Sequence, residues 1–168
     1  MHPDRTYDFR EQLDRALPDE QYVVEVLKKY TLEFAYLEHK QGKQHKADAY
    51  DLNSGEWLEI KVDYTNYPNH FVERFSIYEE QKDGGPWQYF ARGVKYYVFF
   101  YKKIQTIYVF DTQVLMQKIE QLLKDDKIPM QSKCFVKQRN ANYRTYGYKI
   151  PKQLLDSICI KKLVLSEL

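Results

Sequence analysis

The spacing of apolar residues predicts a first amphipathic helix that begins near Pro18. After this point, apolar residues recur on one helical face: Tyr22, Val23, Val26, Leu27 and Tyr30. Proline fits the first turn of a helix because its missing N–H would have no partner there. The following segment, 31–38, is rich in strand-forming residues, and it predicts a strand that ends at a polar, basic loop over 40–46.

A β-hairpin is predicted next, with strands over 48–52 and 56–63 and a turn over 53–55. Glycine at the third position of a three-residue loop fits a type I turn that is closed by a left-handed residue, here Gly55. Side chains alternate between the two faces of a strand, so the loop length decides which residues share a face. With this turn, Leu58 and Ile60 face the core.

The remaining segments predict further alternation of strands and helices. A strand is expected over 69–77, a short helix over 87–92, a second hairpin over 95–101 and 106–110, and a helix that starts at the N-cap Asp111 and ends before Pro129. The tail combines a strand-like piece with a last helix after Pro151. The chain of 168 residues therefore predicts a single α/β domain with a central mixed β-sheet flanked by α-helices.

The predicted hairpin brings Asp51, Glu59 and Lys61 together on its outer face. Neighbouring carboxylates repel each other unless a cation lies between them, and hard oxygen ligands suit Mg²⁺ or Mn²⁺. A lysine beside such a metal can orient water or neutralise the charge of a phosphoryl transition state. A cross-strand ion pair without chemistry would give the same pattern. If the loop held two residues instead of three, Asp48 would replace Asp51 on this face.

The residues Asp51 and Glu59-Ile60-Lys61, placed after a helix and a strand, resemble the PD-(D/E)xK nuclease superfamily. Within it the chain is most similar to small phage and bacterial nucleases in which an E-x-K-x-D motif precedes N-x-x-x-E, here 59–63 and 69–73. The resemblance covers about residues 18–124 and leaves a basic C-terminal extension over 125–168. It implies a restriction-endonuclease-like core and Mg²⁺-dependent (or Mn²⁺-dependent) cleavage of DNA.

The resemblance also implies roles for individual residues. Asp51 and Glu59 would bind the metal together with the carbonyl of Ile60, and Lys61 would be the catalytic lysine. Gln88 resembles a glutamine that positions water or phosphate in some members. A further acid from the first helix would be Glu20, which lies closer to the apolar stripe than Glu25. Glu73 and Asp63 are weaker candidates.

Two basic segments are candidates for contacts with the phosphates of DNA. The first is the loop near the predicted site, with Lys40, Lys43 and Lys46; the second follows residue 133 and contains Lys137, Arg139 and Arg144 among aromatic residues. Charge is divided unevenly: residues 1–84 hold 11 Lys and Arg against 18 Asp and Glu, while residues 85–168 hold 15 against 6. An acidic half that binds a cation and a basic half that binds a polyanion would fit this division.

Several other classes of protein are disfavoured. No apolar run approaches the roughly 20 residues that cross a bilayer, the four histidines lack zinc-ligand spacing, and no Gly-rich phosphate loop occurs. Two cysteines and no apolar leader favour a cytoplasmic protein of a bacterium or a phage-infected cell. Two alternatives to a nuclease acting alone stay open: a catalytically silent nucleic-acid-binding module, and a Holliday-junction-type resolvase, which would act as a homodimer.

Overall fold

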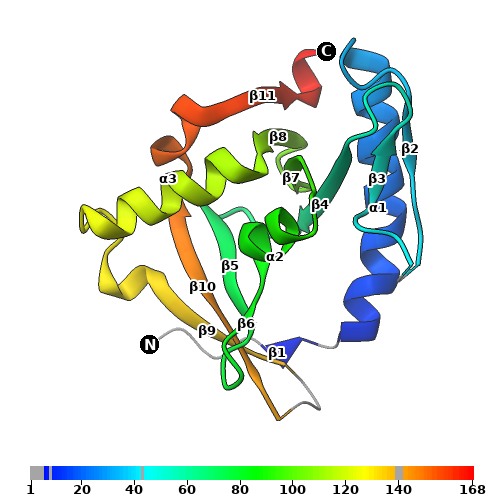
Figure 1. The fold of residues 1–168 in the computed structure, drawn as a ribbon. Helices are drawn as coiled ribbons and strands as arrows, with labels where there is room; N and C mark the ends of the chain where they lie inside the picture. The colour runs from blue at the N-terminus through cyan, green and yellow to red at the C-terminus, as the bar shows by residue number, and fades with distance from the viewer. Residues whose placement is uncertain (1–5, 8, 43, 139–141) are drawn as a thin grey trace.

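Two β-sheets and three α-helices form the fold in the computed structural model, which describes residues 6–7, 9–42, 44–138 and 142–168 (Figure 1). The α-helices are α1 (Phe9–Tyr30), α2 (Gly85–Ala91) and α3 (Thr112–Lys124). The six-stranded sheet has the order β11-β8-β7-β4-β3-β2, and the five-stranded sheet has the order β1-β9-β10-β5-β6. The protein is thus a mixed α/β protein, but its strands form two sheets and not the single sheet that the sequence predicted.

The strands of the six-stranded sheet are β2 (Leu37–His39), β3 (Ala49–Asp51), β4 (Trp57–Asp63), β7 (Tyr96–Tyr101), β8 (Thr106–Asp111) and β11 (Cys159–Val164). Those of the other sheet are β1 (Thr6–Tyr7), β5 (Asn69–Ile77), β6 (Lys82–Asp83), β9 (Lys133–Gln138) and β10 (Arg144–Pro151). Neighbouring strands of the larger sheet are antiparallel except β4 and β7, which are parallel, so this sheet is mixed.

The six-stranded sheet has a separate hydrophobic core on each face. On one face, α1 packs its apolar stripe, including Val23 and Leu27, against Ile60 of β4 and Phe100 of β7. On the other face, rings from β7 and β8 pack against α3 and against β5 and β10 of the second sheet. The continuous apolar run of β7 is explained by this arrangement, because both faces of that strand are buried.

Several predicted boundaries are wrong for identifiable physical reasons. Helix α1 begins at Phe9 and contains Pro18 in its interior, where the proline removes one backbone hydrogen bond, so this proline does not mark the start of the helix. Much of the predicted strand 31–38 is a turn in which the core residue Phe34 accepts a hydrogen bond from the N–H of Leu37, and only β2 remains extended. After Pro151 the chain forms short 3₁₀ turns and then β11, which pairs with β8, so no α-helix forms there.

The predictions for β5, the second hairpin and the cap of α3 are confirmed. Strand β5 has the predicted bounds, although it belongs to the second sheet, and β7 and β8 form the second hairpin. Asp111 caps α3, because its carboxylate accepts a hydrogen bond from the N–H of Val114. No helix among the described residues is long and apolar enough to cross a membrane.

Candidate active site

The turn between β3 and β4 decides which side chains share a face. The N–H of Asp51 donates to the carbonyl of Glu56 at 2.9 Å, and the N–H of Gly55 donates to the carbonyl of Asp51 at 2.8 Å. The loop therefore holds the four residues 52–55, with Gly55 in the left-handed region at φ 75°. Because the loop has an even number of residues, the pairing of the two strands is shifted by one residue from the predicted register. Tyr50 pairs with Trp57 and Ala49 with Leu58, so the residues of β3 exchange faces relative to those of β4.

Asp51 is consequently the last residue of β3, and its side chain lies on the opposite face of the hairpin from the predicted cluster. Its carboxylate accepts hydrogen bonds from the N–H of Asn53 at 3.1 Å and from the hydroxyl of Ser54 at 2.8 Å. The residue is 2% exposed and pairs with Leu37 of β2. The prediction that Asp51 shares a face with Glu59 and Lys61 is wrong, because it assumed an odd number of loop residues.

Asp48 takes the place beside Glu59. Continuing the register of β3 and β4 by one residue sets Asp48 opposite Glu59. The backbone pairing stops at Ala49, and the carboxylate of Asp48 accepts the hydrogen bond from the N–H of Ile60 at 2.9 Å. The N–H and C=O of one strand residue point to the same neighbour, so the Ile60 carbonyl also faces the side of Asp48.

Glu59 and Lys61 lie on β4 and are in direct contact. The Lys61 ammonium is 2.7 Å from a Glu59 carboxylate oxygen, and Glu59 is 4% exposed. Burial opposes the charged form of Lys61, but the charge of Glu59, together with smaller contributions from Tyr89, Tyr97 and Glu73, outweighs burial and holds the lysine pKa well above its usual value. Lys61 therefore stays protonated in this site.

Glu20 reaches the same cluster from α1. It is 8% exposed, and its carboxylate lies 3.2 Å from Nε2 of His39 on β2. Burial raises the pKa of Glu20, and the nearby charge of Glu59 adds to this effect, although the hydrogen bond to His39 opposes it. Glu25, by contrast, has a side chain that is 71% exposed and pairs with Lys28. The preference for Glu20 over Glu25 agrees with this placement.

The residue of α2 that contacts the cluster is Tyr89, and not Gln88. The pKa of Tyr89 is raised, first by burial and also by a hydrogen bond to Glu59, so its hydroxyl stays protonated. Its ring lies 5.2 Å from the Lys61 ammonium and 5.3 Å from the Arg92 guanidinium. Gln88 is half-buried on α2, and among the described residues its side chain forms no hydrogen bond with the cluster.

Like charges make this cluster electrostatically unfavourable in the absence of a cation. Burial raises the pKa of Asp48 to about 9, and the charges of Glu59 and Glu20 contribute to the shift. The pKa of Glu73 on β5 is also raised, mainly by burial. The charge of Glu59 adds to this effect, and the charge of Lys61 opposes it. Asp63, in contrast, lies at the end of β4 and accepts a hydrogen bond from the N–H of Thr65.

Three acids of the cluster already have a polar partner within the protein. Asp48 accepts from Ile60, Glu59 contacts Lys61, and Glu20 contacts His39. Within the part of the chain that the structure describes, no group of three or more His, Cys, Asp or Glu side chains is arranged as a ready metal site. Carboxylate oxygens are nonetheless the ligand type that Mg²⁺ prefers, so the donor chemistry of Asp48 and Glu59 fits this cation.

The predicted DNA-contacting residues are spread over the molecule. Lys46 is exposed, and its ammonium would lie 3.9 Å from a Cβ placed on Gly93 at the end of α2. Lys40 forms an ion pair with Glu38 at 2.9 Å. Lys43 and Arg139 lie outside the described residues.

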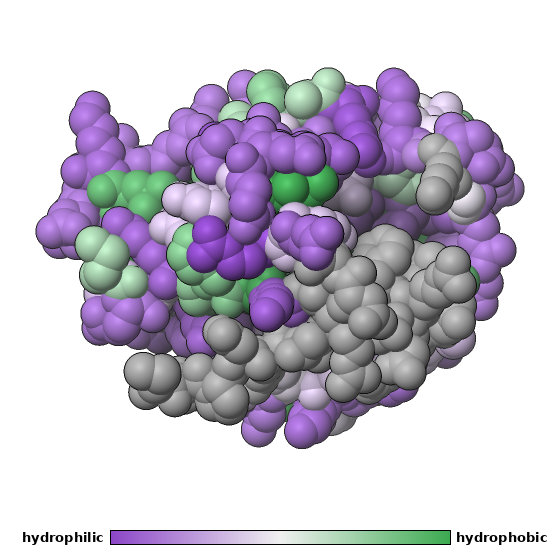
Figure 2. All heavy atoms as spheres, turned by 90° about the horizontal axis from the view of Figure 1, so that it is seen from below, coloured by the Kyte–Doolittle hydropathy of each residue, from purple (hydrophilic) through white to green (hydrophobic). Residues whose placement is uncertain are grey.

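The two other predicted contacts are in the second sheet and not in the cluster. Lys137 on β9 pairs in register with Arg144 on β10. Arg144 forms an ion pair with Glu79 at 2.7 Å and lies 4.3 Å from the ring of Phe135, so a carboxylate already compensates its charge. The face seen from below in Figure 2 is mainly hydrophilic where the described residues form it.

Three residues at the site were not identified from the sequence: His39, Tyr89 and Arg92. His39 ends the short strand β2 next to the predicted basic loop, but a single histidine without a ligand partner carries no recognisable signal. Tyr89 and Arg92 follow Gln88 by one and four residues. The helical period could have grouped Tyr89 with Arg92 on one face of α2, because residues three apart are neighbours on a helix.

Comparison with known proteins gives no relative: the chain matches no family model, no curated protein and no solved structure.

Proposed function

We propose that this protein is a metal-dependent deoxyribonuclease with a restriction-endonuclease-like core. The observation that carries the proposal is the convergence of Asp48, Glu59 and Lys61 on one face of the β3–β4 hairpin, with Glu20 of α1 beside them. These are the residue types that the PD-(D/E)xK resemblance implies. Asp48 supplies the first acid in place of Asp51.

The order of elements around the cluster supports this proposal. A helix (α1) precedes three consecutive antiparallel strands (β2, β3 and β4), and a later helix (α2) leads into β7, which pairs with β4 in parallel. The resemblance implies the same sequence of helix, strand, hairpin with the acid and E-x-K, helix and strand. Strands β5 and β6 are inserted between β4 and α2 and belong to the second sheet.

The two acids of the hairpin supply oxygen ligands of the kind that a divalent cation prefers. Asp48 and Glu59 would hold Mg²⁺ or Mn²⁺, with the Ile60 carbonyl on the same side as a third ligand. The raised pKa of Asp48 reflects repulsion from Glu59 and Glu20 as well as burial, and a cation would relieve that repulsion. When bound, such a metal lowers the pKa of a coordinated water and offsets the charge of the phosphate.

The side chains of the cluster have distinct roles in this proposal. Lys61 keeps its proton, so it stabilises the negative charge that develops on the phosphate and does not act as a general base. Tyr89 and Lys61 together fix the orientation of the Glu59 carboxylate. His39 does the same for Glu20, which lies where it can orient an attacking water.

The proposal is tested by a cleavage assay with the full chain on single-stranded, duplex and branched DNA, in Mg²⁺, Mn²⁺ or EDTA. We expect metal-dependent cutting that falls by at least about 10³-fold in Lys61→Ala, because an electrostatic group is lost from the transition state. Lys103→Ala, at an exposed lysine on the β7–β8 turn, is the matched control and should cut like the wild type.

The outcome also separates the two alternatives. DNA binding without cutting in any metal would overturn the nuclease and favour a silent binding module of the same fold. Cutting confined to branched DNA by a dimer would identify a resolvase.

A further inference from the structure

The face that bears Asp48 and Glu59 continues toward the turn as an aromatic surface. Tyr50 and Trp57 pair across the hairpin with ring centroids 4.9 Å apart, and His45 lies 5.9 Å from Trp57. Side chains that are two residues apart on a strand share a face and lie about 6.5 Å from each other. The ring of Trp57, which is partly exposed, therefore lies one step along β4 from Glu59.

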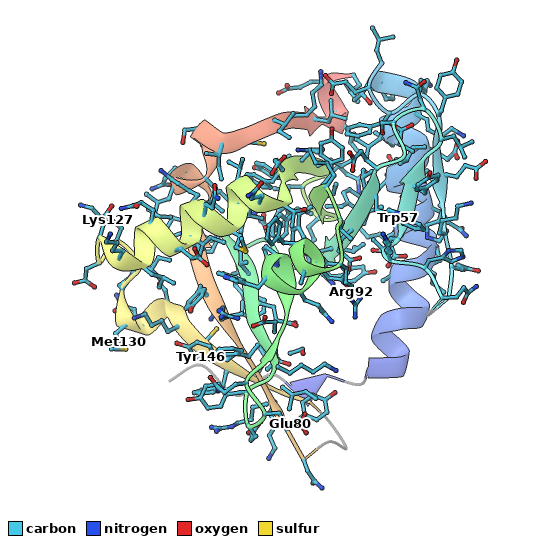
Figure 3. The ribbon with its side chains drawn as sticks, viewed as in Figure 1. Trp57, Glu80, Arg92, Lys127, Met130 and Tyr146 are labelled. Carbon is cyan, nitrogen blue, oxygen red and sulfur yellow. The ribbon has the colours of Figure 1, made fainter. Side chains whose placement is uncertain are left out.

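Two exposed cations lie close to this surface. The Lys46 ammonium lies against Gly93, and the neighbouring Arg92 stacks on Tyr89, which contacts Glu59. Figure 3 shows Arg92 at the end of α2, on the side of the molecule where Trp57 and α1 lie. Neither Lys46 nor Arg92 forms an ion pair with a carboxylate of the described residues, whereas Lys40, Lys95 and Arg144 each do.

We infer that this surface binds an unpaired DNA strand next to the cluster. One base stacks on Trp57, and Lys46 and Arg92 contact phosphates of the same strand. Within a duplex both faces of a base are covered by neighbouring base pairs, so an aromatic ring can stack only on an unpaired or displaced base. The inference rests on the proposed function and specifies its substrate as single-stranded DNA or an unpaired end.

Tryptophan fluorescence can report on this binding directly. The chain has two tryptophans, and Trp87 is 8% exposed, with its indole N–H bonded to Glu120 at 3.0 Å. We expect a short oligothymidylate in EDTA to quench the fluorescence of the wild type. A Trp57→Phe variant, which keeps a ring against Tyr50, should show no quenching, because only the buried Trp87 remains.

Affinity measurements in EDTA test the individual contacts. Trp57→Leu should weaken binding of the oligothymidylate by about 5-fold to 150-fold, the range expected for one stacked base. Lys46→Ala and Arg92→Ala should each reduce the slope of log affinity against log salt by about 0.7. The matched controls are Tyr30→Leu, at an exposed ring at the end of α1, and Lys127→Ala, at an exposed lysine after α3.

Two results would overturn the inference: equal affinity for a blunt duplex of the same length, or affinity of Trp57→Leu equal to that of Tyr30→Leu. The assay reads binding alone, so its result is separate from that of cleavage. A protein that binds through Trp57 and cuts nothing would overturn the proposed nuclease but keep this surface. Metal-dependent cleavage by a protein whose DNA binding does not depend on Trp57 would support the proposed nuclease but overturn the inference about this surface.

Discussion

Glu59 is the residue on which the contacts of the site converge. Its carboxylate is almost fully buried and receives both the ammonium of Lys61 and the hydroxyl of Tyr89. Charged donors form stronger hydrogen bonds than neutral ones, so Lys61 dominates the electrostatics, while the hydroxyl of Tyr89 helps to fix the orientation of the carboxylate. Tyr89 is thus expected to act through Glu59 and not on the substrate.

Replacing Tyr89 by phenylalanine tests this role at the level of one hydroxyl. Tyr89→Phe keeps the ring between Lys61 and Arg92 but removes the hydrogen bond to Glu59. Loss of an outer-shell partner of a metal ligand typically costs 10-fold to 100-fold in metal affinity or activity. We expect cleavage at fixed Mg²⁺ to fall by about this factor and to recover partly at higher Mg²⁺.

A titration of cleavage rate against Mg²⁺ concentration for Tyr89→Phe and the wild type makes this measurement. Tyr108→Phe, in the core between β8 and the second sheet, is a control for loss of a tyrosine hydroxyl elsewhere. Identical Mg²⁺ curves for Tyr89→Phe and the wild type would show that Tyr89 does not orient Glu59.

At the level of elements, the sequence predicted β7, β8 and α3 correctly but not β11, which follows them in the chain and pairs with β8. Strands β7 and β8 and helix α3 follow from a long apolar run, a short polar turn and the N-cap Asp111, which are all local signals. The pairing of β5 with β10 joins segments far apart in the chain, so no local pattern indicates that a second sheet forms.

The candidate site shows the same division between local and non-local information. The motif Glu59-Ile60-Lys61 was identified from its context in the sequence, and Glu20 was chosen from the resemblance and its place beside the apolar stripe of the helix. The structure brings these residues together. The identity of the first acid, Asp48 or Asp51, depended on the length of the loop between β3 and β4. An aspartate at the start of a turn often bonds to the backbone two residues later, and Asp51 does so with Asn53. This tendency could have indicated that the side chain of Asp51 bonds within the turn and that Asp48 is the acid beside Glu59.

The cap of α3 gives a prediction at the level of an element. Asp111 accepts a hydrogen bond from the N–H of Val114 and forms an ion pair with Lys95 at 2.6 Å. Asp111→Ala should lower the free energy of unfolding by about 1–2 kcal/mol. For a chain of this size, each kcal/mol lost lowers Tm by roughly 2–4 °C. Asp111→Ser keeps a capping oxygen and should lose less.

The pH dependence of this cap has a definite sign. Although burial opposes it, the hydrogen bonds from Lys95 and Val114 hold the pKa of Asp111 below its usual value. A carboxyl with a lowered pKa stabilises the folded state above its unfolded pKa and loses this contribution as pH falls through the folded value. Thermal melts should therefore show the full difference between the wild type and Asp111→Ala at pH 7 and a smaller one near pH 3. A difference that grows in acid would contradict this account of the cap.

For the whole molecule, His70 lies where the two sheets meet. It belongs to β5, is fully buried, and contacts rings of β7 and β8, with Nδ1 2.5 Å from the hydroxyl of Tyr101. Its Nε2 has no hydrogen-bond partner among the described residues. Burial, with a smaller effect of the charge of Lys152, lowers the pKa of His70 to about 3. The contact between the sheets thus requires a neutral imidazole.

Acid should consequently weaken the packing of the two sheets. The unfolded chain binds a proton on His70 near pH 6.5, whereas the folded protein does so only near pH 3. The free energy of unfolding should fall as pH drops through this window. The double variant His70→Leu/Tyr101→Phe removes both hydrogen-bonding partners and should fall less steeply. Urea titrations between pH 7 and pH 4 measure both slopes, and equal slopes would show that His70 is not the responsible group.

We propose that Asp48, and not Asp51, completes the site with Glu59 and Lys61. Cleavage of DNA in Mg²⁺ by Asp48→Asn and Asp51→Asn tests this assignment, because both variants replace a carboxyl group by an amide and keep the shape of the side chain. We predict a loss of at least about 10³-fold for Asp48→Asn and activity within a few-fold of the wild type for Asp51→Asn, whose amide oxygen can still accept from Asn53. Loss of cleavage in Asp51→Asn, with Asp48→Asn active, would contradict the register and the site built on it.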